Sequence, residues 1–191
     1  MNPAAEALTR AGLIGAVSGL RSQWGMAAVA WSARPADVSV TARPWVRGAT
    51  LASATGEFVV DKSPRVPSRL TPGGLVPRLV LGALSGMALY RRSEGPATSA
   101  ASPVAAAAAG AVAAGAFACA GAGWRRVAGA RTGDAVAAAV EDVVAVALAW
   151  VACSPAGVRP PCRRAGHAPQ AVEFEGTGTP GTDRAPDGPG E

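Results

Sequence analysis

Six ionisable residues lie inside or at the edge of apolar segments, where charge is costly. On insertion scales, an acid or arginine at mid-membrane costs roughly 2.5 to 3.5 kcal/mol, so such groups normally face the bundle interior and find a partner. We therefore expect an intramembrane ionic cluster, which could bind a cation, relay a proton or hold a small anionic solute. The six candidate residues are Arg21, Glu57, Asp61, Lys62, Glu141 and Asp142.

The spacing of these residues suggests how they pair. Glu57 and Asp61 are four residues apart and share a helix face, whereas Lys62 points elsewhere. Glu141 and Asp142 diverge by about 100°, so at most one can point straight at the bundle centre. Because Arg21 cannot lose its proton, it needs a carboxylate, and we expect Glu57 or Glu141 to supply it.

The same cluster has a second interpretation. Buried ion pairs often fix helix register and do nothing else, so a structural or assembly protein stands beside a transporter or channel. An enzyme ranks third, because no nucleophile with its base, phosphate loop or metal-spaced His/Cys set appears. We expect no catalytic residue, cofactor or metal.

The composition points to a membrane. The chain has 191 residues, of which 49% are hydrophobic and 16% are charged. This is too apolar for a disordered protein and too poor in charge for an ordinary soluble one. The net charge is +5, but the basic residues flank apolar blocks and form no basic face with interleaved aromatics. We therefore expect a multi-pass protein of the cell (inner or plasma) membrane, with the lipid bilayer and not nucleic acid as its partner.

The first two of five apolar segments are interrupted by charge. Residues 11–33 carry Arg21, Ser22 and Gln23 at their centre, which predicts either one spanning helix with a charged waist or two half-helices of roughly 15 Å. Residues 45–60 are short, so they either span with tilt or form an internal helix shielded by neighbours. Proline and glycine predict a loop over residues 63–74.

The remaining three apolar segments have clearer ends. They cover residues 75–90, 104–124 and 135–152; aromatic and arginine residues end the first two, and Asp134 is a reasonable start for the last. Together the segments predict an all-α transmembrane bundle of four to five helices over residues 9–153. Residues 154–191 are rich in proline and glycine and predict a disordered tail.

Small residues recur at helical spacing on several segments. This spacing lets helix backbones approach closely, within the chain or in a homo-oligomer; a pore lining is the alternative. The glycines that we expect at such contacts are Gly12, Gly15, Gly19, Gly82, Gly86, Gly115 and Gly123.

A short internal sequence similarity suggests a repeat. Residues 19–21 (GLR) read like residues 123–125 (GWR), and residues 57–60 (EFVV) read like 141–144 (EDVV). If the second segment spans, the first and fourth helices are antiparallel, and the two units form an inverted repeat.

The stretch EFVVDKSPRVPSRLTPGGLVPRLVLGALSG and the later AVEDVVAVALAW carry a family resemblance. Over about residues 9–153 the chain resembles the uncharacterised bacterial membrane proteins grouped as domain of unknown function 4126 (DUF4126). The resemblance implies an Arg-Ser pair after a small-residue helix, an acidic helix that ends in Asp-Lys-x-Pro, and a closing helix with Glu-Asp. It supports a membrane location and implies no activity.

Overall fold

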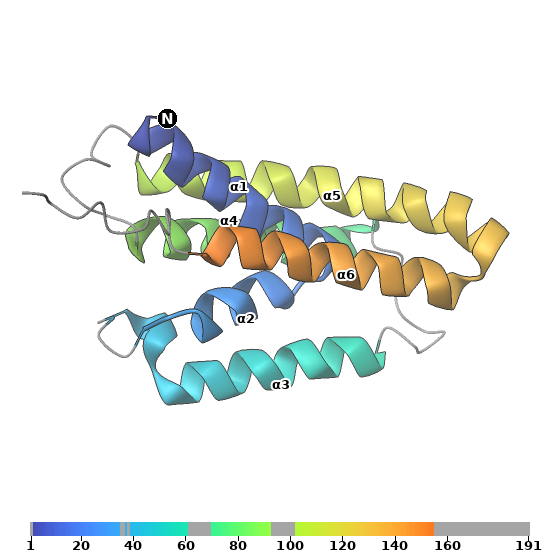
Figure 1. Cartoon of the computed structure of the whole chain (residues 1–191), viewed down its shortest axis with the longest axis horizontal. Helices are drawn as coiled ribbons and strands as arrows, with labels where there is room; N and C mark the ends of the chain where they lie inside the picture. Colours follow the sequence, from blue (N-terminus) through green and yellow to red (C-terminus); the bar gives the residue numbers. More distant parts are fainter. Residues whose placement is uncertain (1, 35–36, 38, 61–69, 93–101, 155–191) are drawn as a thin grey trace, which may run out of the picture. The chain divides into compact units, whose positions relative to one another are not determined.

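The first apolar segment is broken into two helices in the computed structural model of the chain (Figure 1). The structure describes residues 2–34, 37, 39–60, 70–92 and 102–154, without the side chains of residues 58–60. Helix α1 (Pro3–Leu20) starts at a proline, and the side chain of Asn2 caps it by accepting from the backbone N–H of Ala4 at 3.0 Å. It ends at Arg21, whose backbone is extended. The break between two helices is therefore found, but α1 begins eight residues before the predicted segment and, at 18 residues, is longer than a half-helix.

Helix α2 (Trp24–Trp31) does not continue the direction of α1. A Cβ atom built on Gly25 would meet the hydroxyl of Ser18 and the carbonyl of Ile14, so the start of α2 lies back against α1. Figure 1 shows α2 returning toward the end of the bundle where α1 begins. The chain therefore reverses over the three residues between the two helices.

Four further helices complete the described part of the chain. After a short 3-10 helix η1 (Val40–Ala42) come α3 (Pro44–Val60), α4 (Pro72–Arg92), α5 (Pro103–Thr132) and α6 (Asp134–Cys153). The described residues thus form six α-helices, which confirms the all-α prediction but exceeds the four to five helices expected. Helices α4, α5 and α6 are each long and apolar enough to cross a membrane.

Two further predicted boundaries differ from the structure. Residues 72–74 belong to α4 and not to the preceding loop, because proline is well suited to the first turn of a helix, where its missing N–H is not needed. Helix α5 continues beyond Trp124 for two more turns, so Arg125 lies within a helix and not at its end. The α5–α6 turn is made by Gly133, whose φ of +88° favours glycine.

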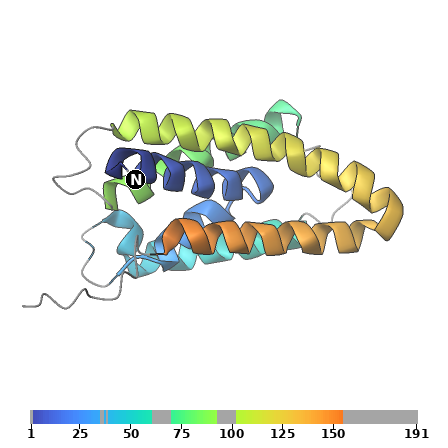
Figure 2. The ribbon, with the colours of Figure 1, turned by 45° about the horizontal axis from the view of Figure 1, so that its top comes forward.

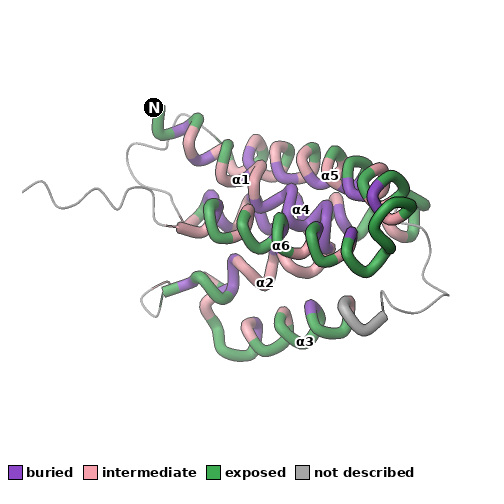
Figure 3. Tube along the Cα trace, turned by 45° about the vertical axis from the view of Figure 1, so that its right-hand side comes forward, coloured by how far each residue is buried: buried purple, intermediate pink, exposed green. Residues whose placement is uncertain are grey.

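The core lies where α1, α4 and α5 meet. Buried residues gather on these helices in Figure 3, while most of α3 is exposed. Gly110 of α5 is at the centre: a Cβ there would collide with the carbonyl oxygen of Gly82, and one on Gly15 would collide with Gly110. Only small residues allow backbones to lie this close.

The predicted packing glycines divide into three groups. Gly15 and Gly19 of α1, and Gly82 and Gly86 of α4, lie at close helix contacts with α5. Gly115 is looser, with the Leu79 side chain 3.2 Å from a built Cβ. Among the described residues nothing lies within 4 Å of a Cβ built on Gly12 or Gly123, so these two serve no such contact.

The expected antiparallel arrangement of the first and fourth predicted helices is wrong. Gly15 of α1 faces Gly110 of α5, and Gly19 faces Ala114, so the contact advances in the same direction on both helices. Helices α1 and α5 are therefore parallel, as Figure 2 also shows. The cause is the reversal between α1 and α2, which adds a pass that the inverted-repeat argument did not count.

Candidate functional site

The break between α1 and α2 leaves backbone N–H groups without helical partners, and Glu57 of α3 satisfies two of them. Its carboxylate accepts from the backbone N–H of Ser22 at 2.8 Å and of Gln23 at 2.9 Å. The hydroxyl of Ser22 donates to the same carboxylate at 2.6 Å. Gln23 gives α2 no side-chain cap of its own. A negative charge at this helix N-terminus also complements the helix dipole.

Arg78 of α4 binds the C-terminal end of α1, on the other side of the break. Its Nε donates to the carbonyl oxygen of Gly19, in the last turn of α1, at 3.2 Å. Its Nη1 donates to the carbonyl of Gly74 at 2.9 Å, and its Nη2 lies 3.6 Å from the Glu57 carboxylate. One guanidinium and one carboxylate, themselves a pair, thus satisfy both broken helix ends. Such pairing is needed wherever a helix break is buried away from water.

Arg21, at the break itself, connects α1 to α6. Its Nε lies 2.6 Å from a carboxylate oxygen of Asp142, and its side chain is only 3% exposed. Asp142 lies outside the partners that the sequence suggested for Arg21. From the spacing we expected at most one of Glu141 and Asp142 to point straight at the bundle centre. In the structure both are used, because their directions reach two different arginines.

Glu141 pairs with Arg125 of α5. The Nε of Arg125 donates to the Glu141 carboxylate at 2.9 Å, and the Glu141 side chain is 1% exposed. A second acid, Asp134, lies 3.7 Å from Arg125 but is 75% exposed. The α5–α6 hairpin is therefore joined by one buried and one exposed ion pair.

These contacts include three ion pairs near one end of the bundle, which together we call the ionic network. It links α1, α3, α4, α5 and α6 and holds the start of α2. Its three arginines balance three carboxylates, and we define it as Arg21, Glu57, Arg78, Arg125, Glu141 and Asp142. Of the predicted cluster, Arg21, Glu57, Glu141 and Asp142 belong to it, whereas Asp61 and Lys62 lie outside the described residues.

The sequence interpretation missed Arg78 and Arg125. Arg78 stands only three residues into the third apolar segment, where the rule that selected Arg21 applies equally. Arg125 follows Trp124 and resembles a membrane-interface residue, and nothing in the local sequence shows that the helix continues.

The far end of α2 is satisfied by arginines. Arg92 of α4 donates to the carbonyl oxygen of Val29 at 2.7 Å and to the hydroxyl of Ser32 at 3.1 Å. Arg47 of α3 donates to the carbonyl oxygen of Ala30 at 3.1 Å. This eight-residue helix thus has a carboxylate at its N-terminus and guanidinium groups at its C-terminus, as its dipole requires.

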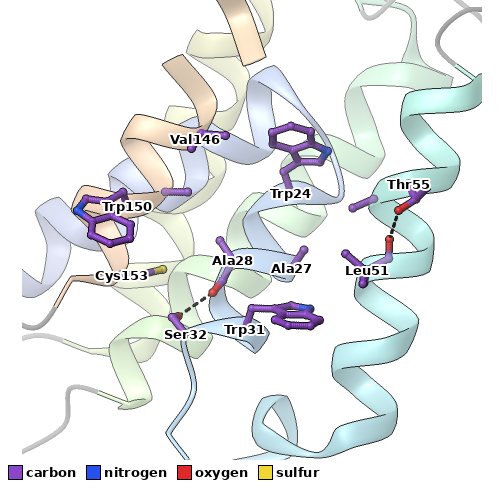
Figure 4. Close-up of a pocket in the computed structure, with 12 residues that line it drawn as sticks. Trp24, Ala27, Ala28, Trp31, Ser32, Leu51, Thr55, Val146, Trp150 and Cys153 are labelled. Carbon is purple, nitrogen blue, oxygen red and sulfur yellow. Dashed lines mark hydrogen bonds between the residues drawn. The ribbon is translucent and has the colours of Figure 1, made fainter. Parts of the chain in front are cut away.

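Two cavities adjoin these elements, and both are apolar. A cavity of about 250 Å³ lies between α1, α5 and α6, with Leu20, Phe117 and Val144 in its lining beside Glu141. A larger groove of about 640 Å³ lies between α2, α3 and α6 (Figure 4). Among the described residues no group of three His, Cys, Asp or Glu side chains could hold a metal ion.

Comparison with known proteins gives one match. The family model described as "Domain of unknown function (DUF4126)" matches residues 9–155. Comparison with curated proteins and with solved structures found no match.

Proposed function

The chain belongs to the DUF4126 family, and from its geometry we propose that it is an integral membrane protein with a structural or assembly role. In this proposal α4, α5 and α6 cross the cell membrane, the lipid bilayer is the main partner, and no reaction is catalysed. The ionic network holds the α1–α2 reversal inside the bundle. The observation that carries the proposal is the engagement of Glu57, which accepts three hydrogen bonds at a helix break and pairs with Arg78.

Transport of an ion or small solute is the second candidate. It is favoured by the burial of Glu141, since carboxylates at membrane depth commonly mark ion or proton pathways. Against it, Glu141 is held by Arg125, and the cavity beside it is lined almost entirely by apolar side chains. A site for a cation would instead offer convergent oxygen atoms.

Flux and stability measured on the same variants separate the two functions. We expect Glu57→Gln and Glu141→Gln to lower thermal stability in detergent, and proteoliposomes of the parent protein to show no more proton, Na⁺ or K⁺ flux than empty vesicles. Flux by the parent protein that either variant abolishes without loss of stability would overturn the structural role. Extraction of the membrane fraction with alkaline carbonate tests the location separately, because an integral protein stays in the pellet.

A further inference from the structure

The groove between α2, α3 and α6 has the features of a lipid site. Helix α2 forms its floor, with Trp24 and Trp31 in the lining, while α3 and α6 form its sides (Figure 4). Leu51 of α3 and Trp150 of α6 are exposed there, at 48% and 77%. The lining is almost entirely apolar. Its volume of about 640 Å³ lies within the range of roughly 300 to 1,000 Å³ in which proteins hold small molecules.

The groove runs along α2 and has two different ends. It follows α2 from Trp24 to Ser32, a length of about 12 Å at 1.5 Å per residue. The Trp24 end lies beside the break, and the other end, at Ser32 and Cys153, lies where α2 and α6 both terminate. Because α6 is long enough to cross a membrane, its end lies near the membrane surface, the depth at which lipid headgroups are found.

Basic side chains surround the outer end of the groove. Arg92 bonds the hydroxyl of Ser32, which lines the groove. Arg10 of α1 donates to the carbonyl oxygens of Ala152 and Ser154, on either side of Cys153. Asp37 lies 3.6 Å from Arg92 and offsets one of the two charges. This end of the groove therefore combines a net positive charge with an apolar channel.

We propose that this groove binds one anionic phospholipid, with an acyl chain between α2, α3 and α6 and the phosphate beside Arg10 and Arg92. Charge complementarity selects this occupant: a phosphate suits the arginines, and an acyl chain suits a lining that is almost entirely apolar. Trp31 is the last residue of α2 and Trp150 lies in the last turn of α6, and tryptophan rings are enriched at membrane interfaces. The proposal rests on the membrane location proposed above.

Native mass spectrometry of the full chain, released from mixed phosphatidylglycerol and phosphatidylcholine micelles, tests the site. We expect one phosphatidylglycerol to be retained per protomer in preference to phosphatidylcholine. Ala149→Phe fills the groove and should abolish retention, whereas Ala147→Phe, at an exposed position on the same helix outside the groove, should leave it unchanged. Equal retention by both variants, or equal retention of both lipids by the parent, would overturn the proposal.

The arginines have their own test. Arg10→Gln and Arg92→Gln retain a donor for the backbone carbonyls but lose the charge. Each should lower the preference for phosphatidylglycerol by about fivefold, the ordinary contribution of one basic residue at an anionic lipid surface. Arg126→Gln, an exposed arginine near the opposite end of the bundle, is the matched control and should change nothing. An unchanged preference in the first two variants overturns the headgroup assignment.

A substitute variant and two contrary outcomes complete the test. If Ala149→Phe fails to fold, Ala28→Leu fills the groove from its floor and should abolish retention in its place. A lipid-free dimer whose formation Ala149→Phe prevents would contradict the proposal and assign the groove to a second copy of the chain. A protein that alkaline carbonate releases from membranes would instead contradict the membrane location.

Discussion

The carboxylate of Glu57 lies 2.8 Å from the backbone nitrogen of Ser22, although the two residues are 35 positions apart in the chain. This contact places the end of α3 against the reversal between α1 and α2. Since Arg78 serves the C-terminal end of α1 at the same place, the reversal depends on side chains from two other helices. It is therefore a tertiary feature and not a property of the local sequence.

Neutralising Glu57 should destabilise the fold. Glu57→Gln removes a charge that accepts three hydrogen bonds, and hydrogen bonds to charged groups each contribute about 1.5–3 kcal/mol. We expect the free energy of unfolding, measured by SDS titration in detergent micelles, to fall by about 2 kcal/mol. Asp134→Asn is the control, because that carboxylate is 75% exposed and its loss should cost less than about 1 kcal/mol. An equal loss of unfolding free energy in Glu57→Gln and Asp134→Asn would show that the hydrogen bonds of Glu57 at the helix break do not stabilise the fold.

Replacement by alanine should have opposite effects at Gly110, which lies at the α4–α5 contact, and at Gly12 of α1. Gly110→Ala forces α4 and α5 apart, and we expect a loss of about 1–3 kcal/mol of unfolding free energy. Gly12→Ala meets no neighbour among the described residues, so it should gain up to about 1 kcal/mol from the better helix propensity of alanine. Thermal melting in one detergent compares the two. A stable Gly110→Ala protein would contradict the close packing.

Arg125 allows a buried pair and an exposed pair to be compared through the same arginine. A double-mutant cycle of Arg125→Gln with Glu141→Gln should give a coupling energy of about 1–3 kcal/mol, because the pair is 2.9 Å apart and Glu141 is buried. The cycle with Asp134→Asn should give less than about 0.5 kcal/mol, since that pair is longer and exposed. Similar couplings in the two cycles would show that the network does not hold the α5–α6 hairpin.

The sequence located most of the helices but did not determine their arrangement. Apolar runs between proline, glycine and charge located α4, α6 and the start of α5 to within a few residues, and Asp134 marked the start of α6, but α5 ends eight residues later than predicted. The Arg21-Ser22-Gln23 interruption allowed both a continuous helix and a break. Only Glu57 and Arg78, which reach it from elsewhere in the chain, decide between them.

The pairing of charges was less predictable for the same reason. Helical spacing states which side chains share a face but not which helix lies opposite, so the contact of Arg21 with Asp142 was not expected. Gly110 was overlooked because glycines on α5 occur at several positions, and only the contact with Gly82 identifies the important one.

Topology mapping tests the α1–α2 reversal most directly. In a chain whose native cysteines are replaced, single cysteines at Asn2, Val40 and Thr132 are labelled by a membrane-impermeant thiol reagent from each side of the membrane. Val40 is 58% exposed between α2 and α3, and Thr132 ends α5 at the opposite end of the bundle. The reversal predicts that positions 2 and 40 are labelled from one side and position 132 from the other. Labelling of positions 2 and 40 from opposite sides, as one continuous span over residues 11–33 requires, would contradict it.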